Sequence, residues 1–468
     1  MSVQLPKLRT RKPATAATQP PSAHSQPAAS ASDALRLHIV YRDPGALKAS
    51  ERQLRKRGRG QVEQLALNLR RFGCVCPILI HEDGTILDGH AIWMAACQIG
   101  MCEVPTVAIS HLSPAEASTL KISLNRIQEL SSWDEIALKT EIEVLIDVDL
   151  GLVGHTAFTT PQIDLILAPQ PPKTKSDPAD LLPSVGERAV SRAGDLWLFE
   201  GGHRLLCADA RERDSFGTLM DGEAARLCAG DLPYNVKIRG HVSGRPAARE
   251  FAMGSGEMSP EAFTAFLRTI FENLAAHSTD GSLHLQFVDW RHLGEMMEAG
   301  RAAYDELINL CVWSKDNAGM GSLWRSQHEL CFVWKHGRSK HLNNVELGRH
   351  GRHRSNVWAY PGANSFRSAR EKAIAAHPTP KSVAMIADAI LDVTERADIV
   401  LDPTVGSGTT LVAAHQTGRR GYGIELDPLY VDLTISRMEQ FTKAAARHAA
   451  TGLTFSETMA ARVAAEAA

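Results

Sequence analysis

A glycine-containing turn between a short apolar run and a helix constrains the fold of this chain more than any other feature. Ile399-Val-Leu401 is typical of a buried strand, and the segment Asp402-Pro-Thr-Val-Gly-Ser-Gly408 that follows is typical of a turn. A helix is expected through Leu411-Val-Ala-Ala414, and Arg420-Gly-Tyr-Gly-Ile-Glu425 is expected to form the next strand. Strand, helix and strand in this order predict a mostly parallel sheet covered by helices.

The same turn is suited to hold a ligand. Glycines let a ligand approach the backbone closely, and the first turn of the helix offers free N–H groups. Glu425 ends the next strand, where a carboxylate can accept hydrogen bonds from ribose hydroxyls. A nucleotide site of another kind, or a simple tight turn, would also contain such glycines. The turn and the acid together favour a cofactor that contains adenosine.

A second segment, Leu227 to Asn235, has an acid, a proline and an aromatic residue at the end of an expected strand. Asp231 and the carbonyl of Leu232 can accept the hydrogens of an exocyclic amine, and Tyr234 can stack on the ring that carries it. The lone pair of such an amine is delocalised into the ring. Holding both hydrogens in tetrahedral directions therefore frees it for in-line attack on a sulfonium methyl group. An ordinary loop with a proline is the alternative.

The 468 residues predict two to four domains. Strand and helix patterns alternate in the second half, whereas the first folded part combines short strands, a hairpin and helices, as a small α+β domain does. The predicted division is disorder over 1–35, the α+β domain over 36–152, a linker over 153–193, an α/β domain over 194–446 and a tail over 447–468.

Bulk composition excludes some classes of protein. No apolar run is long enough to cross a bilayer and no signal-peptide pattern is present, so a cytoplasmic location without a membrane partner is expected by default. The eight cysteines lack Cys-x-x-Cys spacing, so reduced thiols and no metal site are expected. The net charge of −2 does not indicate nucleic acid, but 14 Lys or Arg residues stand against four Asp or Glu residues before Gly73.

The two motifs resemble the signatures of the DNA amino-methyltransferases, an Asp-Pro-Pro-Tyr tetrad and a Phe-x-Gly-x-Gly turn. The chain has Asp231-Leu-Pro-Tyr234 and Thr404-Val-Gly-Ser-Gly408, so Leu232 replaces a proline and Thr404 replaces the phenylalanine. The family uses the backbone carbonyl at the first of these positions, so the change to leucine is tolerable. The tetrad precedes the turn, which is the circularly permuted order of the beta group. The resemblance implies a permuted Rossmann-like sheet flanked by helices.

The resemblance also implies the cofactor S-adenosylmethionine and a set of site residues. Arg204 to Ala210 is similar to the strand whose acid meets the adenine of the cofactor, and His377-Pro-Thr-Pro-Lys381 is similar to the segment at its methionine end. The implied catalytic residues are Asp231, Leu232, Pro233 and Tyr234. The implied cofactor-binding residues are Asp209, Ala210, His377, Thr379, Lys381, Asp402, Pro403, Thr404, Gly406, Gly408, Thr409, Thr410, Glu425 and Leu426.

Double-stranded DNA is the implied partner, and the target base must be flipped out of its stack. Met320 to Glu329 resembles the stretch that lines the target-base pocket, and the basic run Lys335 to Arg354 falls where the beta group carries its target-recognition segment, about 335–356 here. A basic loop that only aids solubility is the alternative, and the sequence leaves a homodimer open. Candidates for phosphate or base-edge contacts are Arg325, Gln327, Arg338, Lys340, Arg349, Arg352 and Arg354.

The first folded part resembles the N-terminal domain of ParB partition proteins and their sulfiredoxin-like relatives. The resemblance is carried by Gln61 to Gly73, Pro77 to Ile80 and Ile86 to His90. ParB proteins hold a nucleoside triphosphate with a Gly-Glu-Arg-Arg box, whereas this chain has Gly89-His-Ala-Ile92 there. We therefore expect neither triphosphate hydrolysis nor thiol chemistry, and we expect His90 to be a structural or a polar surface residue and not a catalytic one. The basic segment Arg52 to Arg59 suits a sequence-independent DNA contact.

The resemblance implies methyl transfer to N6 of adenine in DNA. Transfer to N4 of cytosine is the main alternative, and Asp231 favours adenine because the cytosine enzymes more often carry serine at that position. A C5-cytosine enzyme is disfavoured since no Pro-Cys site is present, and a protein-glutamine enzyme typically has asparagine first and the turn ahead. A ParB-like DNA-binding protein with an inactive methylase domain is the rival from another class. Intact Asp231, Asp402 and Glu425 argue against it.

Overall fold

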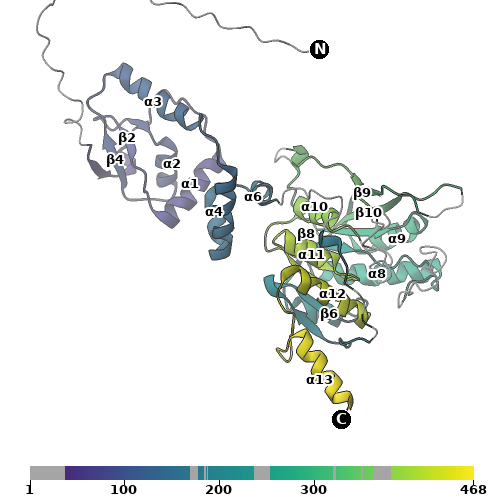
Figure 1. Ribbon diagram of the computed structural model, residues 1–468. Helices are drawn as coiled ribbons and strands as arrows, with labels where there is room; N and C mark the ends of the chain where they lie inside the picture. Colours follow the sequence, from purple (N-terminus) through teal and green to yellow (C-terminus); the bar gives the residue numbers. More distant parts are fainter. Residues whose placement is uncertain are drawn as a thin grey trace, which may run out of the picture. The chain divides into compact units, whose positions relative to one another are not determined.

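The computed structural model describes residues 37–168, 178–183, 186, 188–236, 253–319, 323–348, 352–362 and 381–467. The chain divides into two units, residues 1–132 and 133–468, and each is described by itself (Figure 1). The expectation of disorder over 1–35 lies outside the described residues. No helix in these described ranges has the length and apolar character needed to cross a membrane.

The first unit is a four-stranded sheet with helices, in the strand order β1-β4-β2-β3. The expected hairpin forms, because β2 and β3 pair antiparallel on either side of the turn at Gly84 (φ +81°). Gly73 (φ +76°) ends α1, as its position after the last apolar residue predicts. Its elements are β1 (Ile39–Arg42), η1 (Pro44–Ala46), α1 (Arg59–Phe72), β2 (Ile78–Ile80), β3 (Ile86–Asp88), α2 (His90–Gln98), β4 (Val104–Ala108) and α3 (Pro114–Gln128).

Three further helices belong to the second unit, so the division falls earlier than the expected boundary at 152. Ile142, Val153 and Ile163 form a small core of their own between these helices. Asp164 also accepts hydrogen bonds from Arg419 near the main sheet. Nothing in the local composition distinguishes these helices from the first unit, so only their packing reveals the division. They are α4 (Glu135–Val148), α5 (Leu150–Val153) and α6 (Thr160–Leu167), with the short η2 (Gly154–Thr156).

The second unit is built on a ten-stranded sheet in the order β11-β9-β10-β8-β7-β12-β13-β6-β5-β14. Strands β8, β7, β12, β13 and β6 run parallel, whereas β10 lies antiparallel to both β8 and β9. The strands are β5 (Leu196–Leu198), β6 (Arg204–Cys207), β7 (Ala225–Gly230), β8 (Ser278–Val288), β9 (Glu306–Ser314), β10 (His328–Lys335), β11 (Val357–Ala359), β12 (Ile399–Asp402), β13 (Arg420–Glu425) and β14 (Arg447–His448).

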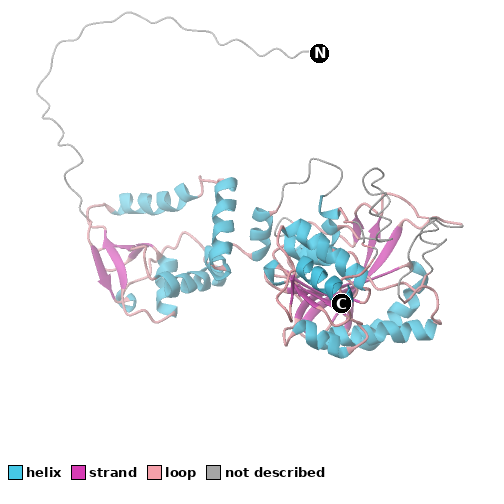
Figure 2. Ribbon diagram, turned by 60° about the horizontal axis from the view of Figure 1, so that its bottom comes forward, coloured by secondary structure: helices cyan, strands magenta, loops and turns pink. Residues whose placement is uncertain are grey.

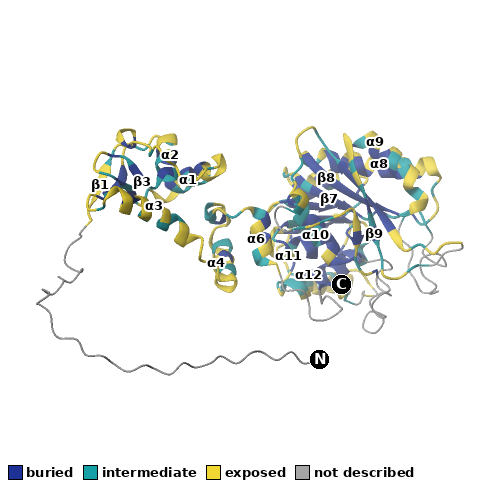
Figure 3. Ribbon diagram, turned by 90° about the horizontal axis from the view of Figure 1, so that it is seen from above, coloured by how far each residue is buried: buried dark blue, intermediate teal, exposed yellow. Residues whose placement is uncertain are grey.

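Helices cover both faces of this sheet, which confirms the expected α/β class (Figure 2). The remaining helices of the second unit are η3 (Pro178–Asp180), η4 (Glu200–Gly202), α7 (Arg213–Met220), α8 (Pro260–Ala276), η5 (Trp290–His292), α9 (Leu293–Ala303), η6 (Glu346–Gly348), α10 (Val383–Val393), α11 (Thr409–Gln416), α12 (Pro428–Thr442) and α13 (Phe455–Ala467). The strands between the helix layers are the most buried part of the unit (Figure 3).

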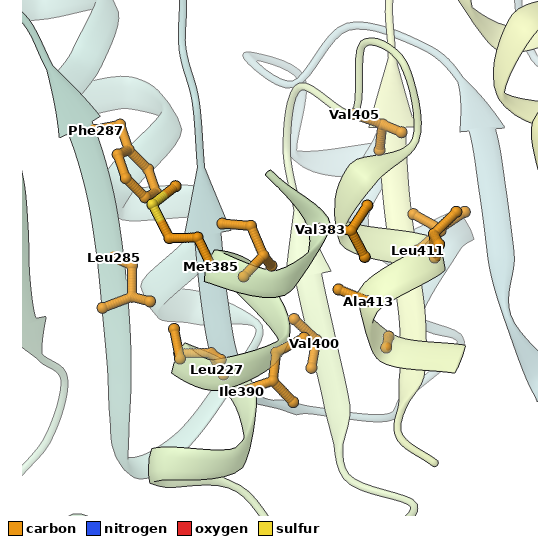
Figure 4. Packing of buried hydrophobic residues seen from close by; sticks show 14 of the residues in the cluster. Leu227, Leu285, Phe287, Val383, Met385, Ile390, Val400, Val405, Leu411 and Ala413 are labelled. Carbon is orange, nitrogen blue, oxygen red and sulfur yellow. The ribbon is translucent and has the colours of Figure 1, made fainter. Parts of the chain in front are cut away.

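The alternation of side chains along each strand divides the core into two clusters. Leu227 and Val400 pack with α10, α11 and α12, and Figure 4 shows them beside Ile390 of α10. Their neighbours Cys228 and Leu401 point to the other face, where the core is formed with α7, α8 and α9. The apolar burial on both faces fixes the sheet, so the ends of its parallel strands are rigid supports for a site.

Candidate active site

An acidic residue stands at the carboxyl end of four neighbouring parallel strands. Asp231 follows β7, and Asp402 is the last residue of β12. Glu425 ends β13, and Asp209 follows β6. All four line one cleft of about 1380 Å³, open solvent included. The cleft is also lined by Ala210, Leu232, Pro233, Tyr234, Lys381, Pro403, Thr404, Gly406, Thr409, Thr410 and Leu426.

The glycine turn is held open by two of these acids. Glu425 accepts the N–H of Gly406 on one carboxylate oxygen and the N–H of Asp427 on the other, both at 2.8 Å. Asp402 accepts the N–H of Thr404 at 3.0 Å and the hydroxyl of Thr410 at 2.6 Å. A side chain on Gly408 (φ +84°) would lie 2.9 Å from Thr434, so this position requires glycine.

Burial changes the titration of both acids of the turn. Asp402 is 4% exposed and Glu425 is 8% exposed. Burial raises the pKa of each to about 7, although the N–H and hydroxyl donors act in the opposite direction. A ligand that brings positive charge or hydroxyl donors into the cleft would therefore stabilise the ionised form of both carboxyls.

The acid of the tetrad lies in a buried cluster of charges, here named the active-site cluster: Asp231, Tyr234, Lys315, Glu329 and Lys381. The hydroxyl of Tyr234 donates to Oδ1 of Asp231 at 2.7 Å. The Nζ atom of Lys381 lies 2.7 Å from Oδ2 of Asp231 and 3.0 Å from Oε2 of Glu329. Lys315 pairs with Oε1, the other oxygen of Glu329. The cluster therefore contains two carboxylates and two ammonium groups.

These groups hold one another in their charged or neutral forms. Burial alone would raise the pKa of Glu329, but Lys381 and Lys315 bring it down to about 2. Burial would lower the pKa of Lys381, yet Asp231 and Glu329 raise it. Burial and the same two carboxylates hold the pKa of Tyr234 well above its ordinary value. Glu329 is therefore anionic, Lys381 cationic and Tyr234 a neutral hydrogen-bond donor near neutral pH.

Glu329 has no assigned role in the sequence analysis, although it ends the stretch that resembles the lining of a base pocket. It stands on β10, which enters the site only because it pairs antiparallel with β8. An acid directly before the apolar run Leu330-Cys-Phe-Val-Trp334 is the signal that could have identified it, because an acid beside buried strand residues needs a partner.

Asp209 is paired within its own turn. The guanidinium group of Arg211 donates to both carboxylate oxygens, with Nη2 at 2.6 Å from Oδ2. Burial would raise the pKa of Asp209, but the hydrogen bonds from Arg211 lower it. Its neighbour Ala210 is buried against the core beneath α8. The pair leaves Asp209 ionised where it lines the cleft after β6.

The structure separates the expected DNA-binding residues into three groups. Arg325 and Gln327 lie exposed on the loop between β9 and β10, where Gln327 donates to the carbonyl of Lys315. Arg338 and Lys340 are exposed beyond the other end of β10, where Lys335 pairs with Leu283 of β8, which itself pairs with Leu227 near the start of β7. They therefore lie at the opposite edge of the sheet from Asp231, because β10 reverses direction relative to β8.

The third group is already paired with acids of α10. Arg352 lies 2.7 Å from Asp392, and Arg354 lies 2.9 Å from the other oxygen of the same carboxylate. Both arginines also contact Asp388. These two guanidinium groups therefore fasten the segment before β11 to α10. The remaining candidates Arg349, His377 and Thr379 lie outside the described residues.

In the first unit, His90 is 2% exposed, and its Nε2 atom accepts the N–H of Ser50 at 3.2 Å. Burial, and then the charges of Arg57 and Lys121, lower its pKa to about 4. The imidazole is therefore neutral and serves as an acceptor for the backbone. Neither unit has, among its described residues, a cluster of His, Cys, Asp and Glu suited to a metal ion.

Comparisons with known proteins agree with both parts of the fold. Residues 225–436 match the family model N6_N4_Mtase, described as DNA methylase. The chain is 28% identical over 144 residues to the Type II methyltransferase M2.MboI of Moraxella bovis, which is 29% of this chain and 51% of that protein. It is 37% identical over 78 residues to the ParB-like nuclease domain-containing protein YnaK of Escherichia coli (strain K12), which is 17% of this chain and 90% of that protein.

The crystal structure of M1.HpyAVI is similar with a TM-score of 0.36 and 18% identity, covering 50% of this chain and 97% of that chain. The chain spans about half the length of the curated methyltransferase M2.MboI that it matches. The expected fusion of two families is confirmed. The N-terminal part of the chain belongs to the ParB-like domain family, and residues 225–436 match the DNA methylase family model N6_N4_Mtase.

Proposed function

We propose that the chain transfers a methyl group from S-adenosylmethionine to an exocyclic amine of a base in double-stranded DNA, with N6 of adenine as the preferred target. One observation carries the proposal: the acid Asp231, which can receive an amine, and the glycine turn with Glu425 line the same cleft. The match of residues 225–436 to the DNA methylase family model supports the same activity.

The tetrad residues supply orientation. Asp231 and the carbonyl of Leu232 accept the two amine hydrogens, and the ring of Tyr234 stacks on the base. The side chain of Leu232 is 2% exposed and packs in the core with Phe263, so a leucine in place of proline leaves the carbonyl available. Asp231 then takes up the proton that the amine loses when its new bond to carbon forms.

The residues around the turn fit the proposed cofactor. Glu425 accepts ribose hydroxyls, and the resemblance assigns Asp209 to the amine of the adenine. Gly406 and Thr409 of the turn line the cleft, where the cofactor can approach the backbone. The bound cofactor supplies an electrophilic methyl group on a positively charged sulfur. The buried carboxyl of Asp402 favours that positive charge in the cleft, because a low-dielectric site strengthens the attraction.

The edge of the sheet that carries the acids also presents exposed aromatic and basic side chains. Trp324 is 85% exposed beside Arg325 on the loop between β9 and β10. Trp290, two residues after the end of β8, is 56% exposed, and the guanidinium carbon of Arg291 lies 5.2 Å from the centre of its ring. Such side chains suit contacts with phosphates and with unstacked bases. We therefore propose that DNA approaches this edge.

The test is product analysis. Purified protein is incubated with labelled S-adenosylmethionine and unmethylated duplex DNA, and the DNA is hydrolysed to nucleosides for mass spectrometry. N6-methyladenine is the expected product. N4-methylcytosine as the product would identify cytosine as the target base, with the same mechanism of transfer. DNA binding without any methylated nucleoside would favour the alternative of a ParB-like DNA-binding protein with an inactive methylase domain.

A further inference from the structure

In the active-site cluster, both oxygens of the Asp231 carboxylate already have partners. Oδ1 accepts the hydroxyl of Tyr234 at 2.7 Å, and Oδ2 lies 2.7 Å from Nζ of Lys381. The side chain of Lys381 is 6% exposed, so water screens little of the attraction between its charge and Asp231. A base amine that enters the cleft must therefore compete with Lys381 for the same carboxylate.

Lys381 has a second carboxylate within reach. Its Nζ atom lies 3.0 Å from Oε2 of Glu329, only slightly farther than from Asp231. Glu329 stands at the start of β10, and Asp231 follows β7, so two different strands hold the two acids. A shift of the flexible lysine tip by a fraction of an ångström would move its charge from one acid to the other without any movement of the backbone.

Lys315 keeps Glu329 available for this exchange. It pairs with Oε1 of Glu329 and also lies 4.5 Å from the centre of the Trp313 ring. Because this partner is on the far oxygen, Glu329 stays ionised and fixed whether or not Lys381 leaves Asp231. Tyr234 is shared in the same way, since its hydroxyl lies 3.2 Å from Oε2 of Glu329.

We propose that Glu329 is a positioning residue that draws Lys381 away from Asp231, so that the carboxylate of Asp231 is free to receive the amine of the target base. The inference rests on the proposed function, because it concerns the acid that receives the amine. Lys381 serves as the counter-ion of Asp231 in the empty cleft and as the counter-ion of Glu329 in the loaded cleft.

The balance of charges in the cluster favours a Lys381 that exchanges between the two acids over a Lys381 that stays bound to Asp231. Two carboxylates and two ammonium groups balance in the cluster. Loss of the Glu329 charge leaves one excess positive charge and a single acid for Lys381 to contact. Asp231 is then held more tightly by Lys381. Removal of Lys381 as well restores the balance and frees Asp231. The two losses therefore have opposite effects on the same carboxylate.

The experiment measures single-turnover methyl transfer with enzyme in excess, which separates chemistry from product release. We expect Glu329→Gln to slow transfer by about 10- to 100-fold, the range for one charge-assisted hydrogen bond. The double variant Glu329→Gln with Lys381→Met is expected to be at least about fivefold faster than Glu329→Gln alone. A structural role for either residue predicts the opposite order, because two losses then add.

A second pair of variants applies even where Glu329→Gln does not fold. Arginine keeps the charge at position 381 and can grip a carboxylate with two bonds, whereas methionine removes the charge. We expect Lys381→Arg to transfer methyl groups more slowly than Lys381→Met. The control is Glu272→Gln, which breaks the exposed pair of Arg268 and Glu272 on α8 and is expected to change neither rate nor melting temperature.

The outcomes separate this inference from the proposed function. No transfer by the unaltered protein would contradict the function itself. Transfer by the unaltered protein, with the double variant no faster than Glu329→Gln, would contradict only the role of Glu329. Lys381→Arg as fast as or faster than Lys381→Met would contradict it independently.

Discussion

The carboxyl ends of the parallel strands form one side of the large sheet, here named the carboxyl edge, and their amino ends form the other side, the amino edge. Each side has a buried ion cluster, and the two clusters differ in whether their hydrogen bonds have one arrangement or two. The carboxyl edge of the parallel strands carries the active-site cluster. The amino edge carries Arg419, directly before β13, with Asp164 of α6 and Arg396, here named the clasp cluster. All five N–H groups of Arg419 have acceptors, namely both oxygens of Asp164, two carbonyls and the Thr394 hydroxyl. Lys381, in contrast, is shared between two acids beside an open cleft.

The difference indicates what each edge contributes. A saturated guanidinium fork has one arrangement, so it fixes α6 on the sheet and adds specificity to the fold. A shared ammonium group has two arrangements of similar geometry, so it can respond to a ligand. Open α/β sheets bind ligands at the carboxyl ends of their strands, and this chain follows that rule with acids at four ends. Substitutions at the carboxyl edge are therefore expected to change function, and substitutions at the amino edge are expected to change stability.

The largest expected effect is on the stability of the clasp cluster. Asp164→Ala leaves the fully buried guanidinium group of Arg419 without its anion, which should lower the free energy of unfolding by about 3–5 kcal/mol. Urea denaturation of the second unit measures this loss. Methyl transfer per folded molecule should stay unchanged at low temperature. An Asp164→Ala variant that is as stable as the unaltered protein but transfers methyl groups more slowly would contradict the assignment of stability to the amino edge and function to the carboxyl edge.

The next effect is on turnover. Asp231→Ala removes the acceptor for the amine, and we expect single-turnover transfer to fall by about 10²–10³-fold, as for loss of one preorganised catalytic group. The free energy of unfolding should change far less than in Asp164→Ala, because Lys381 keeps Glu329 as a partner. Tritiated methyl transfer and urea denaturation on the same preparations give both quantities. Near-normal transfer would contradict the proposed mechanism.

A smaller effect is expected for cofactor affinity. Glu425→Ala removes a buried carboxylate that also holds the N–H groups of Gly406 and Asp427. Loss of one charge-assisted hydrogen bond should weaken S-adenosylmethionine binding by about 1.5–3 kcal/mol. Titration calorimetry measures it. Unchanged affinity would exclude the ribose-binding role, whereas an equal loss in Asp164→Ala would show that the two edges are not independent.

The same carboxyl edge predicts a dependence on pH. Asp402 and Glu425 each have a pKa near 7 in the folded chain, against about 4 in an unfolded chain. Their contribution to stability is therefore fully present below pH about 4 and is lost as the pH rises towards 7. Cofactor affinity has the opposite sign, because hydroxyl donors and positive charge favour the ionised acids.

Calorimetry at several pH values between about 6 and 8 should show S-adenosylmethionine binding strengthening with pH, by less than about tenfold per unit for each acid. Glu425→Gln and Asp402→Asn should each flatten this profile, and the double substitution should remove it. A profile that persists in the double variant would show that the titration belongs to another group.

The sequence predicts the carboxyl edge better than the amino edge, and the reason is physical. The turn from Asp402 to Gly408 and the segment from Asp231 to Tyr234 are local patterns, because backbone conformation requires glycine and a strand end requires particular neighbours. Their meeting in one cleft follows from parallel pairing. Glu329 and Asp164 enter their clusters through pairing and packing between distant segments, so local sequence does not show which residues they contact.

The direction of β10 explains a further difference. The basic run from Lys335 onward has the composition of a DNA contact, but the antiparallel pairing of β10 with β8 carries it away from the cleft. Composition contains no information on strand direction. Arg352 and Arg354 have hydrogen-bond partners on α10 that lie 34 to 40 residues away in sequence. Charge alone therefore does not distinguish a free cation from a paired one.

The smallest expected effect compares exposed cations at the two edges. If DNA approaches the carboxyl edge, Arg325→Ala should weaken duplex binding and reduce the slope of log affinity against log salt by about 1, because one phosphate contact is lost. Arg338→Ala, at the amino edge, should leave the slope within about 0.3 of the unaltered value. Fluorescence anisotropy with a labelled duplex at four salt concentrations measures both slopes. Arg338 is a matched control, since it is also an exposed arginine of the same unit. A larger change for Arg338→Ala would place the DNA on the amino edge, beside the basic run, and would require the target base to reach the cleft around the sheet. Equal changes of slope for the two variants would indicate that the duplex is long enough to contact both edges. A shorter duplex that spans only the recognition site should then lose its contact with Arg338 and keep its contact with Arg325.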